Sequence, residues 1–578
     1  MAASSCAADD GRQVVISSVC LLDGEQYHSR EYVLEMTAQA CGRPGSDLVV
    51  VPFTPFLTFR QERAEGDLAP FAELASAHKT YIALALMQMA EGKLYATSVL
   101  LDRQGQVVAT WRKTHGLSDD RFALGDELEV FRADFGVIGA TIGTDFYFPE
   151  IYEVLRMKGA EVILWQHYPE RFRDHSAWEP LLLARAFDSH VHLVAAHWSD
   201  PRAYITNRYS YGMQGAAWGR SMIVNRVGVP IADTGYEDGI ATAVIDLDKR
   251  KQDPYEGWSK SENCFYVNVL ADRKAFAPVA EPWSPPKLPT FTKRTARVVV
   301  IAMDSGSMWR NEELPHKLLE LLDEAAELKP DIILASEQGA SEDDPTTQKA
   351  LEMVAERARK MGCYICIGGL RDKDFMSIAR LWDRTGELVW QQPIYWTKGF
   401  EQVSYYDTDF ARISTHTCGD LYAPFFDRAL ACKGVELILD PSQMWGPSGR
   451  VNETLLRARS IDNAVWLACS HWNSSDASLR SVIVDPYGQV MASSRHQHEG
   501  IISYDVDFDD RRVYYEGKRA DQPTRGKTDI PSYFSEDMPE QKPGWRNMIF
   551  SHRRPELYGI IPTTNDVIMK YRPERSPF

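Results

Sequence analysis

The sequence predicts two tandem α/β domains, each a layered sheet covered by helices on one side. Three observations support this fold class: the length of the chain, a long internal repeat, and a proline-rich connector between the copies. The chain has 578 residues, whereas single hydrophobic cores stop growing at about 250–300 residues. In each half, strand-like runs alternate with helical stretches, which is the pattern of a layered α/β domain.

The repeat consists of segments that recur in the same order, at similar spacing, in both halves. The matched segments begin at Asp47 and Asp331, Leu100 and Leu381, Lys158 and Lys433, Leu182 and Leu456, Ser221 and Ser481, and Gly239 and Gly500. The first pair is rich in β-branched residues, as buried strands are, and follows a helical stretch in both halves. The second pair is a strand, a turn at glycine and a second strand. Because the matched segments keep the same order over most of both halves, they predict a duplicated domain.

The connector reads Ala277-Pro-Val-Ala-Glu-Pro-Trp-Ser-Pro-Pro-Lys-Leu-Pro and contains five prolines. Such a composition favours a stiff, extended segment over a domain element. We therefore expect a first domain over residues 1–276, a linker over 277–291, a second domain over 292–510, and a C-terminal extension over 511–578.

Composition and charge restrict the partners and the compartment. The net charge is −17, which disfavours nucleic acid and anionic membrane surfaces as partners. The N-terminus lacks the basic and apolar regions of a signal peptide, and no apolar run approaches the ~20 residues needed to cross a bilayer. The nine scattered cysteines are an odd number, which favours reduced thiols. We expect a cytoplasmic protein.

The order of motifs in both copies resembles that of the nitrilase, or carbon–nitrogen hydrolase, superfamily. The motifs that carry the resemblance are Trp111–His115, Thr144–Glu150 and Ala184–Ala186 in the first copy, and Ser336-Glu337, Lys398, Cys418-Gly-Asp420, Ala458–Asn463 and Arg553–Tyr558 in the second. The resemblance implies an α-β-β-α sandwich in each copy. It also implies that the two copies pack as an intrachain pseudo-dimer, because family members usually pair two such domains.

In the second copy the resemblance implies a catalytic triad of Glu337, Lys398 and Cys418. Cys418 is then the nucleophile, and Glu337 takes its proton and returns it to the leaving amine. Lys398 favours the thiolate and, with the backbone N–H of Gly419, stabilises the oxyanion. The spacing agrees, because 61 positions separate Glu337 from Lys398 and 60 separate the aligned Phe53 from Lys113.

The first copy lacks the essential groups of this chemistry. Phe53 stands where the family has glutamate, and Gly143 stands where it has cysteine, although Lys113 is retained. Thr144 is a conceivable substitute nucleophile, but no activating group is evident for it. We therefore expect a catalytically inactive partner whose old pocket is filled by the ring of Phe53.

Three further residues are candidates for the substrate pocket of the second copy. Glu401 is the nearest match to a second glutamate that the family uses soon after the lysine. Trp445 and His471 are candidate pocket residues, and a hydrogen-bonded core position is the alternative for His471. The loop from Lys398 to Cys418 spans 20 positions, whereas the aligned loop of the first copy spans 30, so the substrate class is not inherited from the family.

The resulting hypothesis is a hydrolase that acts on a non-peptide amide through a thioester at Cys418. A nitrilase, an N-acyltransferase and an inactive scaffold remain alternatives. The expected partner is a small-molecule amide or nitrile, with a homo-oligomer of the pseudo-dimer as a further possibility. No cofactor and no metal are expected. Cys363 and Cys366 have the spacing of a redox or zinc pair, but residues three apart in a strand face opposite sides, which favours core packing.

Overall fold

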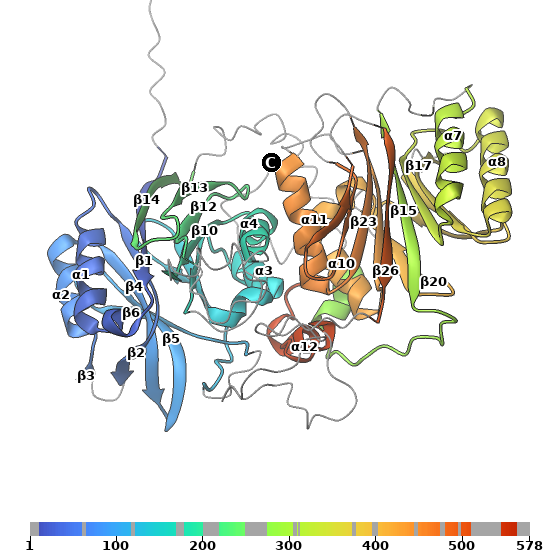
Figure 1. Cartoon of the computed structure of the whole chain (residues 1–578). Coiled ribbons are helices and arrows are strands. Elements are labelled where there is room, and N and C mark those ends of the chain that lie inside the picture. The colour runs from blue at the N-terminus through green and yellow to red at the C-terminus, as the bar shows by residue number, and fades with distance from the viewer. Residues whose placement is uncertain are drawn as a thin grey trace, which may run out of the picture.

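The computed structural model shows two α/β units of the same construction lying side by side (Figure 1). The structure describes residues 11–60, 65–116, 122–168, 178–199, 219–248, 274–304, 309, 313–372, 377–395, 403–443, 449–473, 480–494, 499–509 and 545–562. This arrangement confirms the predicted fold class of two tandem α/β domains.

The first copy contains two sheets that pack face to face. One sheet has the order β11-β1-β2-β4-β5-β6, with β14 beside β1 and β3 beside β2, and the other has the order β13-β12-β10-β9-β8-β7. The strands are β1 (Gln13–Leu22), β2 (Leu48–Arg60), β3 (Glu65–Gly66), β4 (Tyr81–Ala90), β5 (Lys93–Leu101), β6 (Val107–Arg112), β7 (Phe131–Arg132), β8 (Val137–Ile142), β9 (Val162–Gln166), β10 (His192–Ala196), β11 (Trp198–Ser199), β12 (Met222–Val224), β13 (Pro230–Asp233) and β14 (Gly239–Asp246). Buried aliphatic side chains such as Ile16, Val50 and Leu164 fill the space between the sheets.

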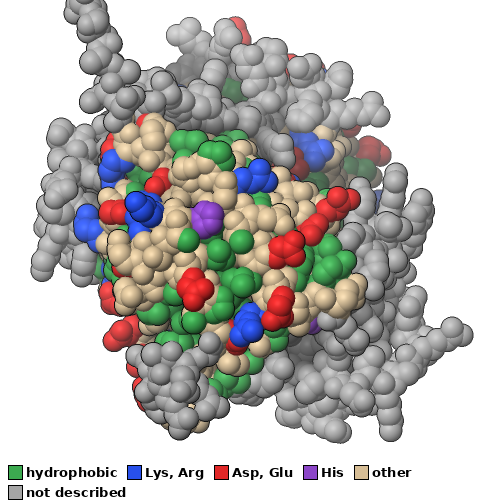
Figure 2. Space-filling view, turned by 90° about the vertical axis from the view of Figure 1, so that its left-hand side faces the viewer, with side chains coloured by type: hydrophobic (Ala, Val, Ile, Leu, Met, Phe, Trp, Pro, Cys, Tyr) green, Lys and Arg blue, Asp and Glu red, His purple; other side chains and the backbone are tan. Residues whose placement is uncertain are grey.

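Helices cover the outer face of each sheet. The helices of the first copy are α1 (Arg30–Cys41), α2 (Ala69–His78), α3 (Pro149–Met157) and α4 (Trp178–Ser189), with 3-10 turns η1 (Glu25–Tyr27), η2 (Gly143–Tyr147) and η3 (Lys274–Ala280). Ser29 caps α1 by accepting the Tyr32 N–H at 3.2 Å, which satisfies one of the free donors at a helix start. Figure 2 shows hydrophobic, acidic and basic side chains interspersed on this side of the molecule.

The second copy repeats this plan, and β15 pairs with β23 as β1 pairs with β11 in the first copy. The sheet order is β19-β18-β17-β16-β15-β23-β22-β21-β20, with β26 beside β15 and the β24–β25 pair beside β23. The strands are β15 (Thr295–Asp304), β16 (Ile332–Glu337), β17 (Tyr364–Arg371), β18 (Ser377–Trp382), β19 (Leu388–Pro393), β20 (Tyr406–Asp407), β21 (Arg412–Thr415), β22 (Leu437–Ser442), β23 (Trp466–Asn473), β24 (Val482–Val484), β25 (Val490–Ser493) and β26 (Gly500–Asp507). The helices and turns are α7 (His316–Ala325), η5 (Ala326–Leu328), α8 (Pro345–Met361), η6 (Cys418–Tyr422), α10 (Pro424–Cys432), α11 (Gly449–Asn463), α12 (Trp545–Ser551) and η7 (Pro555–Leu557).

Strand register shows that the two copies are built alike. Ile16 of β1 pairs with Leu48 of β2, and at the matched place Val298 of β15 pairs with Ile332 of β16.

Of the described helices, none is long and apolar enough to span a membrane.

Cys363 and Cys366 lie on opposite faces of the second copy's first layer. Both side chains are fully buried and carry free thiols. Cys363 packs into the cluster beneath α7 and α8, whereas Cys366 packs between the sheets. The pair therefore contributes to two separate parts of the core.

The start of the predicted linker differs from an extended connector. The 3-10 turn η3 spans Lys274–Ala280 and so crosses the predicted boundary between residues 276 and 277. Phe276 and Val279 are buried against α10 of the second copy, and this apolar packing holds the segment in a turn. The remaining domain boundaries stay a prediction, and residues 511–544 and 563–578 of the predicted extension lie outside the described chain.

The two copies meet through α4 and α11, which lie between them together with α3 and α10 (Figure 1). Arg185 of α4 donates two hydrogen bonds to Asp462 of α11, at 2.8 and 2.6 Å. Arg459 of α11 donates two to Asp188 of α4, both at 2.7 Å. Arg185 aligns with Arg459 and Asp188 with Asp462, so the contact is reciprocal, as in an isologous dimer.

The C-terminal segment, residues 545–562, adds a second link between the copies. Glu150 of α3 is fully buried and pairs with Arg428 of α10 at 3.0 Å and with Arg553 at 2.8 Å. Burial disfavours the Glu150 carboxylate, but the two guanidinium groups outweigh burial and lower the pKa of Glu150 to about 2. The segment thus binds the first copy through charge as well as apolar packing.

We expect the reciprocal pairs to be strongly stabilising relative to their broken forms. Asp462→Asn should lower the free energy of unfolding by about 3–5 kcal/mol, because Arg185 keeps its charge in a buried place without its partner. Urea unfolding measures this change. Asp505→Asn is the matched control, because Asp505 pairs with Arg297 on the surface, where such pairs contribute only about 0–1 kcal/mol. Equal losses in the two variants would contradict a structural role for the interface pairs.

Candidate active site

Cys418 lies on a sharp turn at the point where β21 gives way to η6. Its φ of 51° is in the left-handed region, which costs a non-glycine residue about 1–2 kcal/mol. Asp420 stabilises the turn because its Oδ2 accepts the Thr417 N–H at 3.0 Å. Gly143 begins η2 at the matched position, with a φ of 54°. Both copies therefore make the same turn, but only the second places a side chain on it.

Glu337 ends β16 and faces Cys418. The two side chains are near enough for each to shift the pKa of the other, and the backbone N–H of Gln443 favours the charged form of both groups. Ser377 Oγ donates to Glu337 Oε1 at 2.7 Å. Glu337 is 6% exposed, so its carboxylate is held by specific donors and not by bulk water.

Burial is the main cause of the pKa shifts of Glu337 and Cys418. It raises the pKa of Glu337 to about 7, against the opposing hydrogen bonds from Ser377 and Cys418. Burial and the neighbouring Glu337 carboxylate raise the pKa of the Cys418 thiol well above its ordinary value. A carboxylate of this basicity suits a general base near neutral pH. The thiol still requires a cation to favour the thiolate, and Lys398, the expected cation, lies outside the described residues.

A pair of glycines in β17 lets this strand pass close to both Glu337 and β22. A Cβ on Gly368 would lie 2.4 Å from Cβ of Pro441, and a Cβ on Gly369 would lie 2.6 Å from Cβ of Glu337. Gly369 also has a φ of +72°, which glycine adopts at no steric cost. The two glycines therefore allow β17 to pass directly against Glu337.

The first copy replaces the polar groups of this site with apolar ones at matched positions. The matched pairs are Glu337 with Phe53, Gly368 with Ala85, Ser377 with Ala96, Thr417 with Ile142, and Cys418 with Gly143. The side chains of Phe53, Ala85, Ala96 and Ile142 are buried together as one cluster. The ring of Phe122 packs edge-on against Phe53, with ring centroids 5.8 Å apart.

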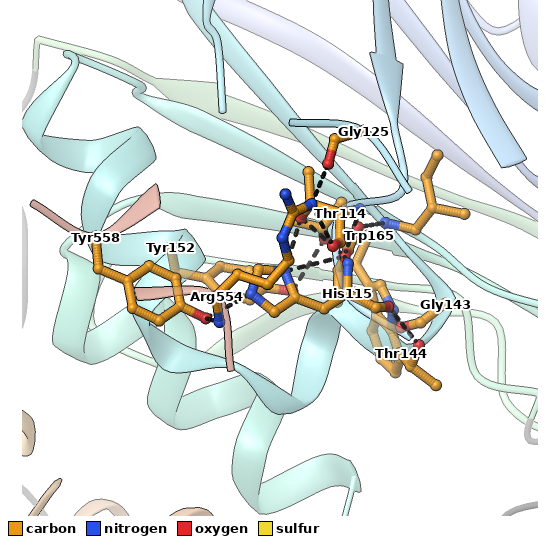
Figure 3. A network of polar contacts seen from close by, with 12 residues as sticks. Thr114, His115, Gly125, Gly143, Thr144, Tyr152, Trp165, Arg554 and Tyr558 are labelled. Atoms are coloured by element: carbon orange, nitrogen blue, oxygen red, sulfur yellow. Dashed lines mark hydrogen bonds and ion pairs between the residues drawn. The ribbon is translucent and has the colours of Figure 1, made fainter. Parts of the chain in front are cut away.

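The turn at Gly143 is closed by further hydrogen bonds (Figure 3). Trp165 Nε1 donates to the Gly143 carbonyl at 3.0 Å, and Thr144 Oγ1 donates to the His115 carbonyl at 2.8 Å. The Nε2 of His115 lies 2.5 Å from the hydroxyl of Tyr558 in the C-terminal segment. Thr144 is 1% exposed, so its hydroxyl is bound to a carbonyl and is closed to solvent.

The predicted site residues divide into two groups. Those that the structure describes are Glu337, Cys418, Gly419 and His471 in the second copy and Phe53, Lys113 and Gly143 in the first. Lys398, Glu401 and Trp445 lie outside the described residues. Gly419 directly follows Cys418 in η6 and is buried. His471 is buried, and its backbone N–H donates to Ser481 Oγ at 2.9 Å.

Sequence reasoning did not identify Ser377, Gln443 or the Gly368–Gly369 pair. Two adjacent glycines inside a strand-like run do indicate a close backbone approach, so this pair was visible in the sequence. Ser377 and Gln443 carry no such signal, because each reaches Glu337 only through the folding of separate strands.

Comparisons with known proteins show which family the chain resembles. The family model for carbon–nitrogen hydrolases matches residues 26–255 and 297–516. A hydrolase from Schizosaccharomyces pombe is 26% identical over 271 residues, which is 43% of this chain and 80% of that protein. The deaminated glutathione amidase of Homo sapiens is 32% identical, over 28% of this chain and 50% of that protein. The omega-amidase of Xenopus tropicalis is 32% identical, over 27% of this chain and 58% of that protein. The chain thus spans about half the length of these two amidases.

Among solved structures, a carbon–nitrogen hydrolase from Helicobacter pylori is 22% identical, with a TM-score of 0.35, over 41% of this chain and 90% of that chain. An amidase from a Nesterenkonia species is 19% identical, with a TM-score of 0.34, over 41% of this chain and 96% of that chain.

The family model covers most of both halves, and the halves share their strand order, their register and the turn at Cys418 or Gly143. The chain belongs to the carbon–nitrogen hydrolase family and carries two tandem copies of its domain.

Proposed function

We propose that the second copy hydrolyses a non-peptide amide through a thioester at Cys418, and that the first copy is catalytically inactive. The observation that carries this proposal is the placement of Cys418, on a strained turn, beside the buried carboxyl group of Glu337. Strained backbone conformations cluster at functional sites. The family match and the amidase names of two relatives support the same chemistry.

In the first half-reaction Glu337 takes the thiol proton and the Cys418 sulfur bonds to the amide carbon. Lys398 and the Gly419 N–H stabilise the tetrahedral oxyanion, whose charge develops on the former carbonyl oxygen. The C–N bond then breaks, the leaving amine takes the proton from Glu337, and a thioester remains on Cys418. Glu401 is proposed as a second glutamate that orients the substrate.

In the second half-reaction water attacks the thioester carbon while Glu337 accepts a proton from the water. The C–S bond breaks, the carboxylic acid leaves, and the proton returns to Cys418. A nitrile substrate would give ammonia and the same acid, and an amine in place of water would give a new amide. Trp445 and His471 remain proposed pocket residues for a small-molecule substrate.

A test of this proposal is a screen of amides, carbamoyl compounds and nitriles that reads released ammonia and acid. For a substrate found this way, Cys418→Ala, Lys398→Ala and Glu337→Gln should each reduce turnover by several orders of magnitude. Double variants should lose little more, because residues that act as one unit are non-additive. Lys113→Ala and Cys432→Ala are matched controls in the first and second copies and should retain most of the activity. Near wild-type turnover in Cys418→Ala would overturn the proposal.

The pKa of Glu337 predicts the pH dependence. Its value of about 7 means that the carboxylate, which is the active base, is lost as the pH falls below 7. We therefore expect kcat/KM to decrease about tenfold per pH unit on the acid side of pH 7. A profile that stays flat down to pH 5 would show that Glu337 is not the base. The control measurement is circular dichroism across the same range, which must show an intact fold.

A further inference from the structure

Behind the Cys418 turn lies a buried charged cluster, defined here as His416, Asp427 and Asp440. All three side chains are fully buried. The Nδ1 of His416 lies 2.9 and 3.0 Å from the two carboxylate oxygens of Asp427, and its Nε2 lies 3.5 Å from Oδ2 of Asp440. The other oxygen of Asp440, Oδ1, accepts the backbone N–H of Cys418 at 3.3 Å. The charged cluster therefore ends on the backbone of the nucleophile.

The first copy has uncharged residues at the three matched positions, namely Thr141, Tyr152 and Trp165. Thr141 Oγ1 and the Tyr152 hydroxyl are 3.0 Å apart and hydrogen-bonded, and Trp165 donates to the carbonyl of Gly143. The first copy therefore packs the matched part of its interior with uncharged side chains. Since buried charges cost free energy unless they are well paired, the charges of the second copy are not explained by the needs of the fold.

The charged cluster holds one imidazole and two carboxyl groups. Burial disfavours the imidazolium of His416, but the carboxylates of Asp427 and Asp440 outweigh burial and raise the pKa of His416 to about 10. The other titratable or charged groups that face the charged cluster are Glu337, Cys418, Tyr422, Arg459 and Cys469.

We propose that Asp440 is a positioning residue of the active site. It holds the strained backbone of Cys418 through the N–H and keeps a fixed negative charge beside the Glu337–Cys418 pair, while His416 and Asp427 lock its carboxylate in place. The proposal rests on the function proposed for Cys418. A negative charge at this place favours the protonated forms of both Glu337 and Cys418, and so raises both of their pKa values. It therefore makes Glu337 a stronger base and the Cys418 thiol a weaker acid.

The test is the rate of Cys418 alkylation by iodoacetamide as a function of pH, with the adduct mapped by peptide mass. This readout needs no substrate. Asp440→Asn removes the charge but keeps the size and a hydrogen-bond acceptor, so the midpoint of the rate profile should move to lower pH by about one unit. Asp383→Asn is the control, because Asp383 binds the Thr385 and Glu387 N–H groups of a remote turn in the same copy. This control should leave the midpoint unchanged.

A purely structural role for Asp440 would lower the rate at every pH without moving the midpoint, and that result would overturn the proposal. If Asp440→Asn does not fold, the triple variant His416→Thr/Asp427→Tyr/Asp440→Trp takes its place in the same assay, because the first copy folds with those residues. A midpoint in the triple variant equal to that of the wild type would overturn the proposal. In the wild type, alkylation of Cys418 no faster than that of Cys432 would instead overturn the proposed function on which it rests.

Discussion

The reciprocal arginine–aspartate pairs tie the interface between the copies to the geometry of the active turn. Arg459 binds Asp188 of the first copy, and its Nε and Nη2 also donate to the Leu421 carbonyl inside η6, at 3.0 and 2.7 Å. Leu421 lies three residues after Cys418. The first copy therefore supplies the carboxylate that orients Arg459, and Arg459 in turn holds the turn that contains Cys418. Without the first copy, Arg459 would lose the Asp188 carboxylate that orients it, so the first copy contributes to the geometry of the second.

The differences between the two copies at the matched site follow the physical costs of buried polar groups and of a left-handed side chain. Gly143 removes the cost of a left-handed side chain, and Phe53 replaces a buried carboxylate with apolar contacts. A neighbouring position also differs: Ala96 of the first copy is matched to Ser377, which donates a hydrogen bond to Glu337. Each replacement relieves strain or desolvation that the second copy still bears. A site without selection for chemistry is expected to change in this direction.

The duplication, the layered fold and the alignment of Cys418 with Gly143 follow from the sequence, because repeated strand patterns fix which residues occupy equivalent places. The sequence did not predict which helix faces would meet, although the Arg-x-x-Asp pattern at Arg185 and Arg459 was present in both halves. Pairing across the interface depends on packing between distant segments. For the same reason His416 and Asp440 gave no signal, since β21 and β22 bring them together. The turn η3 was not predicted, because the proline-rich composition favoured an extended linker and the burial of Phe276 and Val279 depends on packing against the second copy.

We propose that one acyl-enzyme forms per chain, on Cys418. The intact mass of the protein, read after rapid mixing with an amide substrate and quenching with acid and followed by peptide mapping, tests this. We expect one acyl group per chain, on the peptide that contains Cys418, and none in the Cys418→Ala variant. An acyl group within residues 1–276, or turnover with no acyl-enzyme at any mixing time, would contradict it.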